Sequence, residues 1–184
     1  WGGPPDVRTI VIDPGGTLFA HVHVGNITCS TDGGQTWHAT AMDILADVHD
    51  VHADPVRPGR LLAATGRGLA ETQDGGESWQ FDASGLHATY ARAVVQAGET
   101  ILMSVSNGPD GRRSAIYRRE RSSGWQKAHA GLPEWFNDNI DTHKLIACAN
   151  HVMFAVGERI YTSGDAGRSW TQVTNVPRNV HGLT

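Results

Sequence analysis

One eight-residue pattern occurs three times and constrains the fold of this chain more than any other feature. The pattern is Ser/Thr-x-Asp-x-Gly-x-Ser/Thr-Trp, and it occupies residues 30–37, 72–79 and 163–170. The Asp carboxylate can accept hydrogen bonds from backbone N–H groups of a tight turn, and glycine can adopt the positive φ that such a turn needs. The terminal Trp brings a large ring that must pack on a strand layer. Each copy therefore predicts a turn between two antiparallel strands.

The tryptophans give the length of the repeat. Trp37 and Trp79 are 42 residues apart, whereas Trp79 and Trp170 are 91 residues apart, about twice as far. A degraded copy lies between them at residues 121–125, where the Asp is missing but Gly-Trp remains, and the spacings become 42, 46 and 45. Repeats of roughly 40–50 residues with several short strands each are typical of β-propeller blades.

Each repeat divides into four strand-like segments, A to D, separated by turn residues. No segment has a convincing helical pattern. The predicted strands are 7–12, 17–24, 27–31 and 36–40 in the first blade; 48–53, 60–65, 69–72 and 78–82 in the second; 90–96, 100–106, 115–119 and 125–128 in the third; and 142–147, 151–156, 160–162 and 169–173 in the fourth.

The predicted fold class is therefore all-β, a β-propeller of four-stranded antiparallel blades. We expect a single propeller domain or a partial propeller over residues 1–184, with four repeats visible as part of a six- to eight-bladed ring. The blades span about residues 6–40, 47–83, 90–129 and 141–174, and residues 179–184 would begin a further blade. The outer faces of the first and fourth blades would then expose apolar surface.

Composition narrows the function classes and leaves the compartment open. A formal net charge of −4 gives no electrostatic reason to expect nucleic acid or an anionic membrane as a partner. No apolar run approaches the roughly 18 residues of a membrane span, and no signal-peptide pattern is visible, so we expect a soluble chain. Cys29 and Cys148 lie in apolar strand-like segments, which favours two buried free thiols over one disulfide.

The turn motif and its spacing resemble the Asp-box, or BNR repeat, of sialidase-like and sortilin-like β-propellers. The resemblance covers nearly the whole chain and is greatest to bacterial BNR-repeat proteins that are named glycosyl hydrolases on their repeats alone. It implies a structural role for the box, because the C–D turns lie on the rim opposite the usual ligand site. One carboxylate per turn is also too few for calcium. The structural residues are Ser30, Asp32, Gly34 and Trp37; Thr72, Asp74, Gly76 and Trp79; and Ser163, Asp165, Gly167 and Trp170.

The most informative column for function comes from aligning the A strands. If Val7, Val48, Ala91, Thr142 and Val180 are equivalent, each is followed by a basic or titratable residue. A ring of such residues at the mouth of a propeller tunnel could hold a carboxylate or phosphate by charge-assisted bonds. Alternatively, polar residues are simply tolerated beside a wet channel. The candidate ligand-binding residues of this column are Arg8, His49, Arg92, His143 and His181, with Tyr90 close by.

A long connection at residues 131–141 supplies a second group of candidates. Glu134, Trp135, Asp138 and Asp141 combine an aromatic ring with carboxylates, as a carbohydrate-binding platform would. The alternative is that Trp135 and its neighbour Phe136 only anchor the loop on its blade. Arg112 and Arg113 lie in the extended B–C loop of the third blade, where they could meet an acidic group or be merely solvated.

Histidines give only a weak indication of a metal. His21 and His23 alternate in a predicted strand and so face one side, an arrangement that can present two imidazoles to zinc. No third ligand can be identified, so packing or tunnel lining is the default interpretation. We expect no metal and no cofactor.

The first functional hypothesis is a binding module that takes a carbohydrate, a small anionic ligand or a protein partner at the top ends of its blades, which carry the B–C loops and D-to-A connections. The alternative is a sialidase-like glycoside hydrolase that uses carboxylates there, with Asp47, Glu134, Asp138 and Asp141 as candidates. Sialidases carry an Arg-Ile-Pro motif near their start, which is absent here, and no Tyr–Glu pair can be identified. The catalytic residues, and whether the chain is an enzyme, stay undetermined by the sequence.

Overall fold

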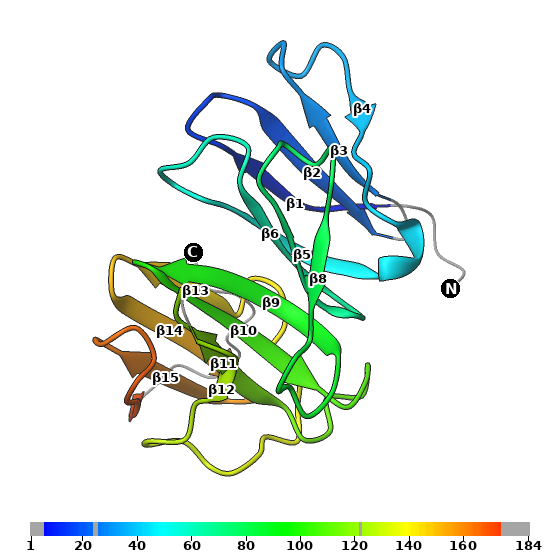
Figure 1. The fold of residues 1–184 in the computed structure, drawn as a ribbon. Coiled ribbons are helices and arrows are strands. Elements are labelled where there is room, and N and C mark those ends of the chain that lie inside the picture. The colour runs from blue at the N-terminus through cyan, green and yellow to red at the C-terminus, as the bar shows by residue number, and fades with distance from the viewer. Residues whose placement is uncertain (1–5, 24–25, 122, 174–184) are drawn as a thin grey trace. The chain divides into compact units, whose positions relative to one another are not determined.

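The computed structural model describes residues 6–23, 26–121 and 123–173. These residues form four sheets, each of four antiparallel strands that pair in chain order (Figure 1). The one helix among them is a 3₁₀ turn at Ile44–Ala46, capped by the Asp43 carboxylate, which accepts a hydrogen bond from the Leu45 N–H. The described residues contain no helix with the length and apolar character that a membrane crossing requires.

The strand bounds follow the sequence pattern closely. The first sheet contains β1 (Asp6–Ile12), β2 (Leu18–His23), β3 (Ile27–Ser30) and β4 (His38–Ala39), and the second contains β5 (Val48–Ala53), β6 (Leu61–Thr65), β7 (Gly68–Thr72) and β8 (Gln80–Asp82). The third contains β9 (Tyr90–Ala97), β10 (Thr100–Ser106), β11 (Ala115–Arg119) and β12 (Gln126–Lys127), and the fourth contains β13 (Leu145–Cys148), β14 (His151–Val156), β15 (Arg159–Ser163) and β16 (Thr171–Val173).

The prediction of an all-β fold of four-stranded antiparallel blades is confirmed, and β5, β10, β11 and β14 match their predicted ranges residue for residue. The largest error is at β13, which begins at Leu145 rather than at residue 142. The Lys144 N–H donates to the Asp141 carbonyl at 2.9 Å, and His143 has a φ of 64°. This tight turn takes the chain out of the extended conformation just before the strand.

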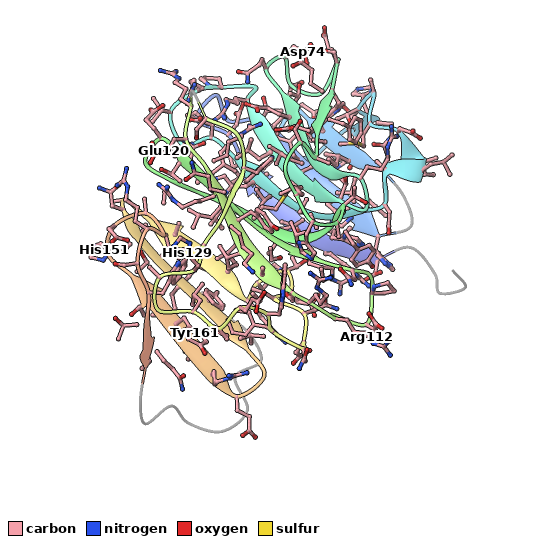
Figure 2. The ribbon with its side chains drawn as sticks, turned by 60° about the horizontal axis from the view of Figure 1, so that its bottom comes forward. Asp74, Arg112, Glu120, His129, His151 and Tyr161 are labelled. Carbon is pink, nitrogen blue, oxygen red and sulfur yellow. The ribbon has the colours of Figure 1, made fainter. Side chains whose placement is uncertain are left out.

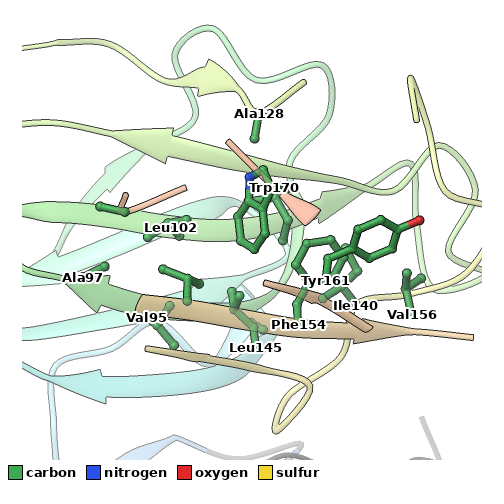
Figure 3. Close-up of a cluster of buried hydrophobic side chains, with 14 of the residues drawn as sticks. Val95, Ala97, Leu102, Ala128, Ile140, Leu145, Phe154, Val156, Tyr161 and Trp170 are labelled. Atoms are coloured by element: carbon green, nitrogen blue, oxygen red, sulfur yellow. The ribbon is translucent and has the colours of Figure 1, made fainter. Parts of the chain in front are cut away.

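The chain divides into two compact units, residues 1–82 and residues 83–184, called here the N-terminal and C-terminal units. In the N-terminal unit the first two sheets enclose a cluster that includes Phe19, Ile27 and Leu61. In the C-terminal unit the cluster shown in Figure 3 contains Phe154, whose ring stacks on Tyr161 with centroids 5.0 Å apart. Packing one sheet face on another thus supplies the core of each unit.

The antiparallel order assigns every loop to one end of its sheet. The A–B and C–D turns lie at one end, which we call the bottom end. The B–C loop lies at the other, the top end, where the D strand also leaves for the next sheet. Figure 2 shows two residues near opposite ends of the third sheet: Arg112, from its B–C loop, and Glu120, at the end of β11.

All three complete copies of the repeated motif form the predicted turn at a bottom end. In the first copy, Asp32 Oδ1 accepts from the Thr36 N–H at 2.9 Å and Oδ2 accepts from the Thr36 hydroxyl at 2.6 Å. The Ser30 hydroxyl donates to Asp32 Oδ1 at 2.8 Å and accepts from the Gly34 N–H at 2.9 Å. The same four bonds recur in the copies that begin at Thr72 and Ser163.

The two cysteines are free, but the prediction that both are buried is wrong. Cys29 in β3 is half-buried, whereas Cys148 is exposed at the last position of β13. Cys148 pairs with His151 across the A–B turn, where the strand reaches solvent.

The prediction of exposed apolar surface on the first blade agrees with β1, where Val7, Ile10 and Ile12 are more than half exposed. On the fourth sheet, an apolar hollow of about 490 Å³ is lined by residues that include Ile146, Val152 and Met153.

Candidate functional site

The aligned A strands share a structural irregularity at the column predicted from the sequence. In β1 the register shifts between Val7 and Thr9, and in β5 it shifts between Val48 and Asp50. In β9, Val94 and Ala91 oppose Met103 and Val105, so two residues of β9 face the single Ser104. These are β-bulges, which redirect the local side chains. The residues in the bulges are Arg8 in β1, His49 in β5, and Arg92 with Ala93 in β9.

In the N-terminal unit both bulge residues lie against carboxylates. Arg8 Nε is 3.6 Å from Asp6 Oδ2, and His49 Nε2 is 3.3 Å from Asp47 Oδ2. The His49 side chain is only 2% exposed. Asp47 adopts a φ of 54°, which is unusual for a residue other than glycine. His49 is therefore part of the packed interior of its sheet pair, with its ring directed at a local acid.

In the C-terminal unit the structure brings three predicted site residues together. Arg92 Nε donates to Asp141 Oδ1 at 2.6 Å, and Nη2 of the same guanidinium contacts that oxygen. Nη1 donates to the Tyr90 hydroxyl at 3.3 Å. The Thr142 hydroxyl donates to the Arg92 carbonyl at 3.0 Å, which links the segment before β13 to β9. The Arg92 and Asp141 side chains are 21% and 32% exposed, so a ligand can reach this group.

The remaining members of the column are placed differently. His143 is exposed in the turn before β13 and is not a strand residue, so its predicted position within an A strand is wrong. Val180 and His181 lie outside the described residues. Each of the three bulge residues has a carboxylate beside it, so the column is charge-balanced rather than purely basic.

Two loops clamp together at the top end of the third sheet. Ser114, at the end of the B–C loop, forms paired backbone hydrogen bonds of 2.9 and 2.8 Å with Phe136 of the long connection. The Asn139 side-chain amide donates to the Pro109 carbonyl at 2.8 Å. Gly111, at a φ of 72°, lies so close to the Asn139 backbone that a Cβ would collide with it. These contacts hold the 107–114 loop against the 131–141 connection.

Trp135 lies at this junction with two cations against its indole ring. Lys127 Nζ is 3.5 Å from the ring centroid and Arg113 Cζ is 4.4 Å from it. The His87 ring is tilted against the indole with centroids 4.6 Å apart, and His87 Nδ1 is 3.0 Å from the Tyr117 hydroxyl. Such cation–π contacts stabilise the ring and its neighbours. We call these five residues the Trp135 cluster.

The two aromatic residues of the long connection have different roles. Phe136 is 2% exposed and packs edge-on against Phe154, so it anchors the loop, as one of the two alternatives predicted. Trp135 is half-buried, and cations already lie against its ring. Its availability as a stacking platform for a sugar is correspondingly reduced.

The carboxylates considered for hydrolysis have separate surroundings. Asp47 and Asp141 are engaged by His49 and Arg92. Glu134 and Asp138 are exposed, and Asp138 Oδ1 accepts from the Asn139 N–H at 2.9 Å. Among the described residues, no hydrogen bond or ion pair joins two of these four carboxylates.

The two weak metal candidates, His21 and His23, have different surroundings. His21 is 1% exposed, and burial, with a smaller contribution from His49, lowers its pKa to about 4. Neither of its ring nitrogens has a hydrogen bond of good geometry within the described residues, although the Val48 backbone is near enough to oppose that shift slightly. His23 Nδ1 is 3.5 Å from Asp6. Residues 6–23, 26–121 and 123–173 contain no group of three His, Cys, Asp or Glu side chains suited to a metal.

Sequence reasoning missed His87, Tyr117 and Lys127, since each stands alone in the sequence without a motif around it. The bridge between Ser114 and Phe136, together with the hydrogen bond from Asn139 to Pro109, brings the loop of Arg113 to Trp135. The pattern that could have indicated the cluster is the placement of all five residues at or near top ends.

Comparison with known proteins identifies the fold. No family model matches the chain, and no curated protein matches it. Among solved structures, an ancestral GH74 enzyme is similar over 96% of this chain with a TM-score of 0.75 and 15% identity. The extracellular domain of BT3049 from B. thetaiotaomicron is similar over 94% of the chain with a TM-score of 0.66 and 15% identity. A structure of YCF48 bound to D1 peptide is similar over 94% of the chain with a TM-score of 0.52 and 14% identity.

These neighbours are β-propeller proteins, so the chain has a β-propeller fold. It spans 25% of the GH74 chain, 24% of the BT3049 chain and 68% of the YCF48 chain. At sequence identities of 14–15%, these similarities establish the fold and do not assign a function.

Proposed function

We propose that this chain is a β-propeller module of the BNR/Asp-box kind that binds a polar ligand at the top ends of its sheets. The observation that carries the proposal is the group formed by Arg92, Tyr90 and Asp141 at the bulge of β9. The group is fixed by its own hydrogen bonds and is partly open to solvent. It therefore combines preorganisation with access, which a binding site needs.

The chemistry of this group suits a ligand with hydroxyl or amide groups. Asp141 balances the charge of Arg92, so an isolated anion gains less here than at a bare arginine. A guanidinium, a carboxylate and a phenol together still offer both donors and acceptors. A carbohydrate or a peptide presents such groups. Two of the similar structures, an ancestral GH74 enzyme and YCF48 bound to D1 peptide, support both classes of ligand.

The second candidate is a glycoside hydrolase, and two observations favour it. The structure with a TM-score of 0.75 is that of a GH74 enzyme, and Glu134 and Asp138 are exposed in one loop. Against it, Asp141 already accepts two N–H groups of Arg92 and is engaged in holding that side chain. Binding without hydrolysis is therefore the primary proposal.

The test is binding of the purified chain to glycan and peptide arrays, followed by titration of each hit. Arg92→Gln and Tyr90→Phe are the variants, and Arg112→Gln is the matched control because Arg112 pairs with the nearby Asp110 and its side chain is 79% exposed. We expect Arg92→Gln to weaken binding at least tenfold while Arg112→Gln leaves it unchanged.

Equal binding by Arg92→Gln and wild type would refute the proposed site. Prolonged incubation of each glycan hit with the wild type separates the two functions. Hydrolysis that is lost in Glu134→Gln or Asp138→Asn would establish the second candidate instead.

A further inference from the structure

Two positive charges converge on one indole ring in the Trp135 cluster. Arg113 comes from the B–C loop of the third sheet, whereas Lys127 is the last residue of β12. Their distances to the Trp135 centroid, 4.4 and 3.5 Å, limit the separation of Arg113 Cζ and Lys127 Nζ to at most 7.9 Å. Two positive charges at such a separation act together on an anion that binds beside the ring.

Among the described residues, no carboxylate forms an ion pair with either of these cations. In the described part of the C-terminal unit, Arg92, Arg112 and Arg118 each form an ion pair with Asp or Glu, but neither Arg113 nor Lys127 does. Lys127 Nζ donates to the neutral backbone carbonyl of Glu134 at 2.7 Å. Like charges held this close repel each other, so an anion bound beside them would reduce that repulsion.

The backbone around Arg113 and Trp135 fixes the positions of these two residues. Arg113 has a φ of 53°, a conformation that a residue other than glycine adopts only where its surroundings enforce it. The next residue, Ser114, is locked to Phe136 by two backbone hydrogen bonds, and Phe136 directly follows Trp135. The strained backbone thus places the guanidinium of Arg113 at the indole of Trp135.

The polar neighbours of the ring experience the same positive field. Burial lowers the pKa of His87 most, a hydrogen bond with the Arg113 backbone opposes this shift, and the charges of Arg113 and Lys127 lower the pKa by smaller amounts. The imidazole is therefore neutral at neutral pH and keeps a hydrogen-bond donor. Burial raises the pKa of Tyr117, so its hydroxyl stays protonated beside His87 Nδ1. His87 and Tyr117 therefore add no negative charge beside the two cations.

We propose that Arg113 and Lys127, held against Trp135, form a binding site for an oxyanionic group such as phosphate, sulfate or carboxylate. The site goes beyond the proposed function, because it is separate from the Arg92 group and selects for negative charge. A ligand of the top ends would then carry an acidic substituent that this site recognises. Trp135 serves as the surface on which both cations are ordered, instead of as a platform for a neutral sugar.

The experiment uses simple anions as probes. The indole N–H resonances of the wild-type chain are followed by NMR during titration with sodium phosphate, sodium sulfate and sodium acetate. Sodium chloride at matched ionic strength and pH is the reference. Trp135→Phe assigns the Trp135 resonance. We expect a saturable shift of that resonance with phosphate or sulfate that chloride does not produce, and acetate reports whether a carboxylate suffices.

Matched variants locate the site. Arg113→Gln and Lys127→Gln are expected to weaken phosphate binding at least tenfold, whereas Arg112→Gln, at the adjacent exposed position, keeps wild-type binding. Lys127→Arg, which retains the charge, is expected to bind, and it covers the case in which Lys127→Gln fails to fold. Arg92→Gln is also expected to bind phosphate normally, so failure of the proposed function and failure of this inference are distinguishable.

Two results would overturn the proposal. One is a Trp135 resonance that moves equally in phosphate and chloride, which would reveal only a general salt effect. The other is equal phosphate binding by Arg112→Gln and Arg113→Gln.

Discussion

The first and last complete motif turns have the same hydrogen bonds but different burial. Asp32 and Asp165 each accept the same backbone and hydroxyl bonds within their turns. Trp37 is 42% exposed, whereas Trp170 is 5% exposed and packs edge-on against Phe154 at 4.9 Å. The turn is thus a local structure that residues 30–37 or 163–170 form by themselves. Burial of the tryptophan depends on a second sheet.

The neighbouring sheet explains this difference. The backbone N–H of Trp170 donates to the Ala130 carbonyl, and the Trp170 side chain belongs to the cluster that includes Leu102 of β10. Trp170 therefore packs onto the sheet that precedes its own in the chain. Among the described residues, no sheet precedes that of Trp37. The motif thus stabilises its own turn in every copy, but it joins two sheets only where an earlier sheet is present.

Replacing each tryptophan by alanine should separate these two roles most clearly. We expect Trp170→Ala to lower the free energy of unfolding by about 3–5 kcal/mol, as for other buried aromatic residues. Trp37→Ala should cost less, about 1–3 kcal/mol, because 42% of the residue is already exposed to water. Urea denaturation followed by circular dichroism measures both. Equal losses would mean that Trp37 is buried in solution by a surface outside the described residues.

A buried histidine adds a pH dependence that any comparison of the turns must remove. Burial lowers the pKa of His21 to about 4, so below about pH 6.5 the unfolded chain binds more protons than the folded one. Stability should therefore fall as pH decreases from 6.5 to 4, by about 3 kcal/mol from this residue. Unfolding measured at pH 7 and pH 4.5 should show a smaller difference in His21→Leu than in the wild type. His52, whose pKa burial also lowers to about 4, accounts for part of the remaining slope.

The glycines of the two turns test the packing difference without removing a large side chain. Gly34 and Gly167 have φ values of 89° and 79°, so alanine at either position costs about 1–2 kcal/mol in backbone conformation. A Cβ at Gly167 would also collide with Leu102, whereas at Gly34 its nearest neighbour is Leu18 Cδ1 at an ordinary 3.6 Å. Gly167→Ala should consequently be the more destabilising by about 1–3 kcal/mol in urea denaturation. The opposite order would show that Leu102 moves aside.

The sequence predicted what is local and missed what is assembled from distant segments. The spacing of Trp37, Trp79 and Trp170 predicted the repeat, and the strand ranges followed from alternation and turn residues. The exposure of Trp37 was not predictable, because it depends on a neighbouring sheet and not on the motif. β13 was misplaced because a turn closed by the Lys144–Asp141 hydrogen bond has no strong sequence signal.

The candidate site shows the same limit. Alignment of the A strands placed Arg8, His49 and Arg92 in one column, and the structure gives each of them a place in a bulge. Their carboxylate partners were not predicted. Asp141 lies 49 residues from Arg92, and only the packing of two sheets within the C-terminal unit brings the two together.

The smallest expected difference concerns the two aspartates, where the turns should behave alike. Hydrogen bonds from the hydroxyl and backbone N–H of Thr36, and from Ser30, hold the pKa of Asp32 well below its usual range, and Ser169 and Ser163 do the same for Asp165. Their stabilising effect is present above about pH 4, the pKa of an unfolded Asp, and is lost as pH falls toward the folded pKa. Asp32→Asn and Asp165→Asn, made in the His21→Leu background, should therefore flatten the stability profile below pH 4 to the same extent. A larger effect at Asp165 would mean that the turn contributes to the packing of Trp170, and the separation between local hydrogen bonding and sheet burial would fail.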